Sequence, residues 1–113
     1  MKLKEVVDKL DLKVEGWGNG LDREVTGGYT SDLLSDVIAN SKKGNIWITL
    51  QIHQNIVAVA TLRELSAIII IGGKEPSPDT LAKAKDEGIP VITSPLTAFE
   101  LSGRLYALGL QDE

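Results

Sequence analysis

Two short apolar segments dominate the hydrophobic pattern of the chain, at Ile46 to Leu50 and at Ala67 to Ile71. The second contains four consecutive isoleucines, so it lacks the alternation of apolar and polar positions that marks a half-exposed strand. Continuous apolar strands are typical of a parallel sheet covered on both faces. The connector between them, Ile56 to Leu62, is also almost entirely apolar. We therefore predict a parallel β-α-β unit at the centre of the fold.

The connector could be a helix or a further strand, because Val57, Val59 and Thr61 are β-branched and alternate with alanine. A crossover between parallel strands needs about a dozen residues, close to the span of residues 54–66, and this favours a helix. A helix that is apolar on every side is either buried or covered by a partner. Since a small α/β domain offers few interior helix positions, we predict a homodimer. The predicted interface residues are the apolar ones early in this helix: Ile56, Val57, Val59 and Ala60.

The remaining elements are predicted from amphipathic spacing and from glycine and proline positions. Helices are expected over residues 3–10, from a cap at Ser31 or Asp32 to an end within residues 40–44, from Ser77-Pro78 to Gly88, and from either Ser94-Pro95 or Thr97 onward. Strands are expected at residues 12–14 and 89–93, with an edge strand within residues 23–29. Strands and helices thus alternate from residue 45 onward. The predicted fold class is α/β, a single domain of residues 1–113 with three layers (α/β/α) around a small, mostly parallel sheet.

Composition and charge exclude several function classes. The 113 residues are 42% hydrophobic and 25% charged, which fits one globular domain. The net charge is −4 and Lys42-Lys43 is the one adjacent basic pair, so nucleic-acid binding is disfavoured. No apolar run approaches the roughly 18 residues of a membrane span, so we expect no membrane partner and a cytoplasmic location. The chain has no cysteine, which excludes disulfides and thiolate chemistry.

Ligands of open parallel sheets bind beyond the carboxyl ends of the strands, where helix N-termini present free N–H groups. Three junctions of the predicted fold are rich in polar side chains and glycine, and they form the candidate site for an anion or nucleotide. The candidate residues are Thr49, Gln51, His53, Gln54 and Asn55 in the first junction, Gly72, Gly73 and Lys74 in the second, and Thr93 and Ser94 in the third. Each junction also has a structural explanation, with Asn55, Ser77 and Ser94 as helix caps and Gly72-Gly73 as a turn.

His53 is the single histidine and therefore the candidate for proton transfer. A metal site would need partner ligands, and no carboxylate lies at a recognisable ligand spacing, so we predict no metal and no cofactor. A buried or capping histidine, bonded to Gln54, Asn55 or the backbone, is the favoured interpretation.

The sequence resembles the DRTGG domain. The resemblance lies in Asp22-Arg23 and Thr26-Gly27-Gly28, in Ser31 to Val37, in Trp47-Ile48-Thr49, and in His53 to Ala60. Here the motif is interrupted, because Glu24 and Val25 separate its two parts. That family occurs beside CBS domains in pyrophosphatases, in phosphate acetyltransferases and as small proteins associated with iron-only hydrogenases, and it is similar to the N-terminal domain of HPr kinase. The resemblance implies a regulatory or dimerising α/β module without catalysis of its own.

Two functional hypotheses follow. The first is a non-catalytic regulatory module that dimerises and either senses a small anionic ligand or nucleotide or docks on a metabolic enzyme complex, such as that of an iron-only hydrogenase. The second is a small enzyme acting on a phosphorylated or nucleotide substrate, with His53 as general base and Lys74 holding phosphate. The sequence has no G-x-x-x-x-G-K-[ST] phosphate loop, which disfavours phosphoryl transfer.

Overall fold

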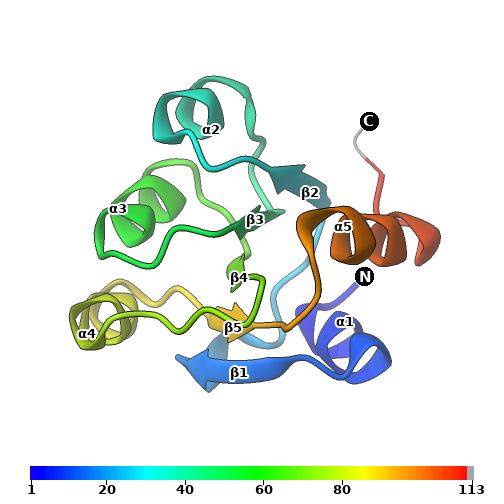
Figure 1. Cartoon of the computed structure of the whole chain (residues 1–113), viewed down its shortest axis with the longest axis horizontal. Coiled ribbons are helices and arrows are strands. Elements are labelled where there is room, and N and C mark those ends of the chain that lie inside the picture. The colour runs from blue at the N-terminus through cyan, green and yellow to red at the C-terminus, as the bar shows by residue number, and fades with distance from the viewer. Residues whose placement is uncertain (112–113) are drawn as a thin grey trace.

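The computed structural model describes residues 1–111, which form a five-stranded sheet with helices on both faces (Figure 1). The strands are β1 (Lys13–Gly16), β2 (Gly27–Thr30), β3 (Asn45–Thr49), β4 (Ala67–Ile70) and β5 (Val91–Thr93). The helices are α1 (Leu3–Leu10), α2 (Leu34–Asn40), α3 (Asn55–Leu62), α4 (Pro78–Glu87) and α5 (Ala98–Ala107), with a short 3-10 turn η1 (Gly18–Gly20). None of these helices has the length and apolar character that crossing a bilayer requires.

The sheet has the order β1-β5-β4-β3-β2. Strands β2 to β5 are parallel, and β1 adds to the β5 edge in the antiparallel direction. Residue pairs such as Trp47 with Ile68 and Ile69 with Ile92 set the register of the central strands. The predicted three-layer α/β fold with a mostly parallel sheet is confirmed, and so is the edge position of β2.

Each face of the sheet has its own core. Helices α1 and α5 cover one face, whereas α2, α3 and α4 cover the other (Figure 1). Side chains of a strand point alternately to the two faces, so Ile69 and Ile71 join the first core while Ile68 and Ile70 join the second. Burial on both faces explains why the four isoleucines are consecutive.

Helix α3 forms as predicted, but its surroundings differ from the prediction. It contacts α2 on one side and α4 on the other, and so occupies the middle of its layer (Figure 1). Ile56, Val57 and Ala60 have no exposed surface, and Val59 is 6% exposed. These four side chains are buried within the chain itself and are not available to a second copy. The prediction that they form a dimer interface is therefore wrong.

Helix starts were predicted with mixed success. Ser77 and Pro78 begin α4 as expected, and Thr97 rather than Ser94 begins α5, where its side chain accepts a hydrogen bond from the Glu100 N–H (3.3 Å). Asn55 was expected as a cap but is the first helical residue of α3, after Gln54 at the cap position.

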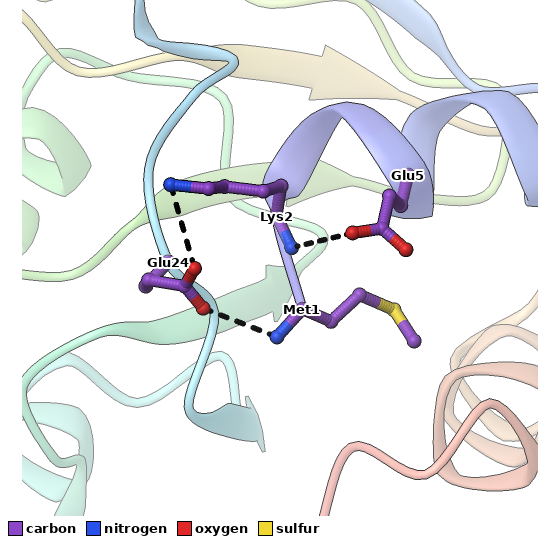
Figure 2. Close-up of polar contacts among 4 residues, drawn as sticks. All are labelled: Met1, Lys2, Glu5 and Glu24. Atoms are coloured by element: carbon purple, nitrogen blue, oxygen red, sulfur yellow. Dashed lines mark hydrogen bonds and ion pairs between the residues drawn. The ribbon is translucent and has the colours of Figure 1, made fainter.

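The first residues of the chain are tied to the segment that precedes β2 (Figure 2). The Met1 ammonium donates to Glu24 Oε2 (3.1 Å), and Lys2 Nζ lies 3.4 Å from Glu24 Oε1. The hydrogen bond from the ammonium, followed by its charge, lowers the pKa of Glu24. The backbone supports the same pairing, because Val25 N donates to Met1 O (2.8 Å).

Asp36 of α2 gives a prediction on pH. Its Oδ1 accepts hydrogen bonds from Tyr29 Oη (2.7 Å) and Asn40 Nδ2 (2.8 Å), and these bonds, the Tyr29 bond first, lower the pKa of Asp36. A carboxyl with a lowered folded-state pKa stabilises the fold above its unfolded pKa, and the stabilisation is lost as the pH falls through the folded one. The free energies of unfolding of the wild type and Asp36→Asn, measured in urea, should therefore differ most near neutral pH and converge in acid. A difference independent of pH, or an equal trend in the exposed-loop control Asp22→Asn, would contradict this prediction.

Candidate functional site

The four parallel strands end at one edge of the sheet, which we call the carboxyl edge. Strands β2, β3 and β5 end there in threonines, Thr30, Thr49 and Thr93. Helices α2, α3, α4 and α5 follow β2, β3, β4 and β5 in turn, so all three predicted junctions lie at this edge. The sequence therefore located the candidate residues on a common edge, but the structure divides them into separate groups.

The first group is organised by Asp32, in the loop after β2. Its Oδ1 accepts from Thr49 Oγ1 (2.9 Å) and from the Leu50 N–H (2.7 Å), and its carbonyl accepts from Gln51 Nε2 (3.0 Å). Two predicted site residues, Thr49 and Gln51, thus serve to join the β2 and β3 loops. Asp32 was predicted only as a possible helix cap, and Leu33 holds the cap position of α2 instead. The partners of Asp32 were not predictable, because they come from a strand that is a neighbour in space and not in sequence.

His53, Gln54 and Asn55 form the second group, at the start of α3. All three side chains are exposed, and no hydrogen bond to the His53 side chain occurs within residues 1–111. The favoured interpretation of His53 as a buried or capping residue is therefore wrong. The first turn of α3 contains no acidic residue and its cap makes no side-chain hydrogen bond, whereas α4 and α5 carry Asp79 and Glu100 at the same place.

Four other candidates line one pocket of about 200 Å³ between the start of β1 and the ends of β4 and β5. The lining residues are Asp11, Lys13, Gly73, Lys74, Glu75, Thr93, Ser94 and Pro95. His53 is not among them, so the structure does not bring the suggested base into the pocket that Lys74 lines.

A glycine turn shapes this pocket. Gly72 and Gly73 have φ of 69° and 73°, in the left-handed region that favours glycine. Gly72 N donates to Leu96 O (2.9 Å) and Gly73 N donates to Ser94 O (3.2 Å). The turn after β4 is therefore fastened to the turn after β5, and both backbone donors are already used within the fold.

The charges of the pocket are mixed. Lys13 Nζ lies 3.1 Å from Glu15 Oε1, and this hydrogen bond raises the pKa of Lys13. The same oxygen of Glu15 accepts from Thr93 Oγ1 (3.1 Å). Lys74 is exposed beside Glu75. Acidic and basic groups nearly balance here, so the pocket gives an anion much weaker attraction than a cluster of basic groups would.

The part of the chain that the structure describes contains no group of three or more His, Asp or Glu side chains placed to hold a metal ion.

The residues of the interrupted Asp-Arg and Thr-Gly-Gly motif lie at the opposite edge of the sheet. Arg23 donates from Nη1 to Leu65 O (3.3 Å) and from Nη2 to Gly88 O, the turns that precede β4 and β5. Thr26 Oγ1 donates to Lys43 O (2.8 Å) at the turn before β3. Both residues fasten the loops that enter the parallel strands, which is a structural role. Asp22 is exposed.

A scan against protein-family models finds no match, and a search of curated proteins finds none either. Among solved structures, the chain matches a crystal structure of the CBS and DRTGG domains of the regulatory region of Clostridium perfringens pyrophosphatase, complexed with the activator diadenosine tetraphosphate. The TM-score is 0.66 over 97% of this chain, at 21% sequence identity. The chain has the fold of a DRTGG domain. This chain covers 47% of the length of the pyrophosphatase chain. The complex with diadenosine tetraphosphate is therefore a property of that regulatory region as a whole.

In this DRTGG fold, the Thr-Gly-Gly part of the motif is explained only in part by its contacts. Thr26 packs so closely on Gly44 that a Cβ added to Gly44 would lie 2.7 Å from Thr26 Cγ2. Gly44 also has φ of 84°, so glycine is required there on both counts. Gly27 is buried at the start of β2. Gly28 has neither a left-handed φ nor a crowded site, since an added Cβ would meet nothing closer than Ile46 O at 3.7 Å.

Proposed function

We propose that this chain is a non-catalytic regulatory module that binds a small anionic ligand at its carboxyl edge, with adenine nucleotides as the first class to test. The observation that carries this proposal is the fold match over 97% of the chain to a regulatory region complexed with a dinucleoside polyphosphate. The match is to a regulatory region and not to a catalytic domain, which supports a role without turnover.

The start of α3 is the part of the carboxyl edge best suited to hold the anion. The helix dipole favours negative charge at the start of a helix. In α3 the N–H groups of Ile56 and Val57 already donate to His53 O (3.2 Å) and Gln54 O (3.0 Å). The support for this site is therefore the dipole and not a set of free first-turn donors. Helix α3 alone among α2 to α5 lacks an acidic side chain in this turn. His53, Gln54 and Asn55 add exposed donors around it.

The absence of an organised proton-transfer pair within residues 1–111 also supports a non-catalytic role. A general base is normally oriented by a hydrogen-bonded partner. His53 has none in the described structure, and the pocket lined by Lys74 lies apart from it. No observation favours the enzyme hypothesis.

Homodimerisation, docking on a metabolic enzyme complex and a cytoplasmic location remain predictions. If a partner surface exists, it lies away from the buried face of α3. The outer face of α5 is the better candidate, because Phe99 is 91% exposed and Tyr106 is 60% exposed there. Burying such aromatic side chains is a common source of binding energy at interfaces.

Nucleotide binding is tested by thermal unfolding in the presence of ATP, ADP, diadenosine tetraphosphate or inorganic phosphate. A ligand at 100 times its dissociation constant adds about 2.7 kcal/mol to the free energy of unfolding, so a bound nucleotide should raise Tm by several degrees. Asn55→Asp should reduce this shift, because it places a negative charge in the first turn of α3.

The matched control is Ala58→Asp, which puts the same charge on an exposed position of α3 beyond its first turn. It should leave the nucleotide shift nearly unchanged. If none of the four compounds raises Tm, the proposed function is wrong. If Asn55→Asp and Ala58→Asp behave alike, the anion does not bind at the start of α3.

A further inference from the structure

A pocket of about 280 Å³ lies between edge strand β2 and helix α5, and neither the fold nor the proposed function explains it. Figure 1 shows β2 beside α5, which covers the face of the sheet opposite α2, α3 and α4. This pocket contains none of the candidate residues at the start of α3 and none of those around Lys74. An inference about it therefore goes beyond the proposed function.

Gly28 leaves space in this pocket, because it has no side chain. It lines the hollow from β2, where neither its backbone angle nor crowding demands a glycine. Glycine within a strand is unfavourable, because it loses more conformational freedom on folding and has no side chain to pack. A side chain at this position would project into the hollow. The glycine of the motif that the fold leaves unexplained thus provides space beside α5.

The walls of the pocket define what it can accept. Ile48 and Leu105 form an apolar floor, and Tyr106 contributes an aromatic side chain that is 60% exposed. Thr30 and Ser102 lie at the wall with their hydroxyl oxygens 2.8 Å apart. Because one hydroxyl of such a pair donates to the other, the second still has a proton to donate to a ligand. No charged side chain of residues 1–111 lines the pocket.

We infer that this pocket binds an uncharged planar heteroaromatic ring of nucleobase size. The aromatic side chain and apolar floor suit the face of such a ring, and the hydroxyl pair suits its edge heteroatoms. The absence of formal charge among the described residues of the walls disfavours a phosphate or carboxylate inside the pocket. The hydroxyl pair also favours a heteroaromatic ring over a purely aliphatic group, because only the ring has an edge atom that accepts the remaining hydroxyl proton.

Adenosine is the probe, because it carries the ring without a phosphate. In a ¹H–¹⁵N NMR titration, adenosine should shift the amide signals of Gly28, Thr30, Ser102 and Tyr106, and leave those of residues 53–55 unchanged. Gly28→Val should fill the pocket and weaken adenosine binding by about tenfold or more, as should Tyr106→Ala, which removes the aromatic wall.

Gly28→Val also separates binding from folding. Valine suits a strand, and the space around Gly28 is free of close contacts, so this variant should be at least as stable as the wild type. Gly28→Ala provides a smaller change if valine disturbs the edge strand. Phe99→Ala is the control, because Phe99 is exposed on α5 but does not line the pocket, and it should leave adenosine affinity unchanged.

Three results would overturn the inference: no adenosine binding at millimolar concentration, signal changes confined to other residues, or unchanged affinity in folded Gly28→Val and Tyr106→Ala. Signal changes at Gly28 and Tyr106 that follow protein concentration without adenosine would also overturn it, because a second copy of the chain would then occupy the pocket. A nucleotide that binds at residues 53–55 while adenosine fails to bind would leave the proposed function intact.

Discussion

Trp47→Ala is expected to cause the largest loss of stability of any single substitution considered for this chain. Trp47 lies in the middle of β3 with no exposed surface, and its Nε1 donates to Ser31 O (2.8 Å). Truncating a buried tryptophan costs about 3–5 kcal/mol through lost burial and the cavity left behind. Domains of this size are stable by only about 5–15 kcal/mol, so the variant should be marginally folded or unfolded at 37 °C.

The measurement is urea unfolding followed by far-UV circular dichroism, because the substitution removes one of the two tryptophan fluorophores. Trp47→Phe is the matched variant. It keeps an aromatic ring in the core but leaves the Ser31 carbonyl without its donor, which should cost roughly 1–3 kcal/mol. If the free energy of unfolding of Trp47→Ala lies within about 1 kcal/mol of that of the wild type, the Trp47 side chain does not contribute to the core as the structure indicates.

The central strands were predictable from sequence because burial on both faces leaves a direct mark on composition. Ile68 to Ile71 could not alternate with polar residues once helices covered both sides of β4. The ends of α4 were predictable for a similar local reason, since Ser77, Pro78 and Gly88 act within a few residues of their own position.

The surroundings of α3 were not predictable from its own residues. An apolar helix surface predicts that something covers it, but the covering elements, α2 and α4, are set by how the crossovers place helices along one face of the sheet. The helix itself was therefore predicted correctly, but a second copy of the chain was predicted where α2 and α4 cover it. The same limit applies to Asp32, whose partners Thr49 and Leu50 belong to the neighbouring strand and its loop.

The candidate site was predictable as an edge but not as a set of contacts. Parallel topology alone places Thr49, Lys74 and Ser94 at the ends of strands on one side of the sheet. Whether they meet depends on turns such as Gly72-Gly73, which fasten the β4 loop to the β5 loop and leave His53 elsewhere. Arg23 shows the reverse case, in which a residue singled out by resemblance fastens backbone turns at the opposite edge.

Arg23→Ala should lower stability by roughly 1.5–3 kcal/mol, the usual range for a hydrogen bond to a charged group, and should do so without altering ligand binding at the carboxyl edge. The half-buried guanidinium donates to two carbonyls, Leu65 O and Gly88 O, which lie in the turns before β4 and β5. Removing it leaves both carbonyls without this donor. Arg23→Lys should recover only part of the loss, because an ammonium lacks the planar fork that reaches two acceptors at once.

The comparison with Asp22→Ala decides whether the Asp-Arg pair acts as a unit. Asp22 is exposed, and substitutions at such surface positions usually change stability by no more than about 0.5 kcal/mol. Urea unfolding should therefore separate the two neighbours clearly, while the nucleotide-induced shift in Tm stays the same in both. Equal losses in the two variants would indicate an Asp22-Arg23 ion pair in solution, and a lost nucleotide shift in folded Arg23→Ala would place the ligand at the motif edge instead of the carboxyl edge.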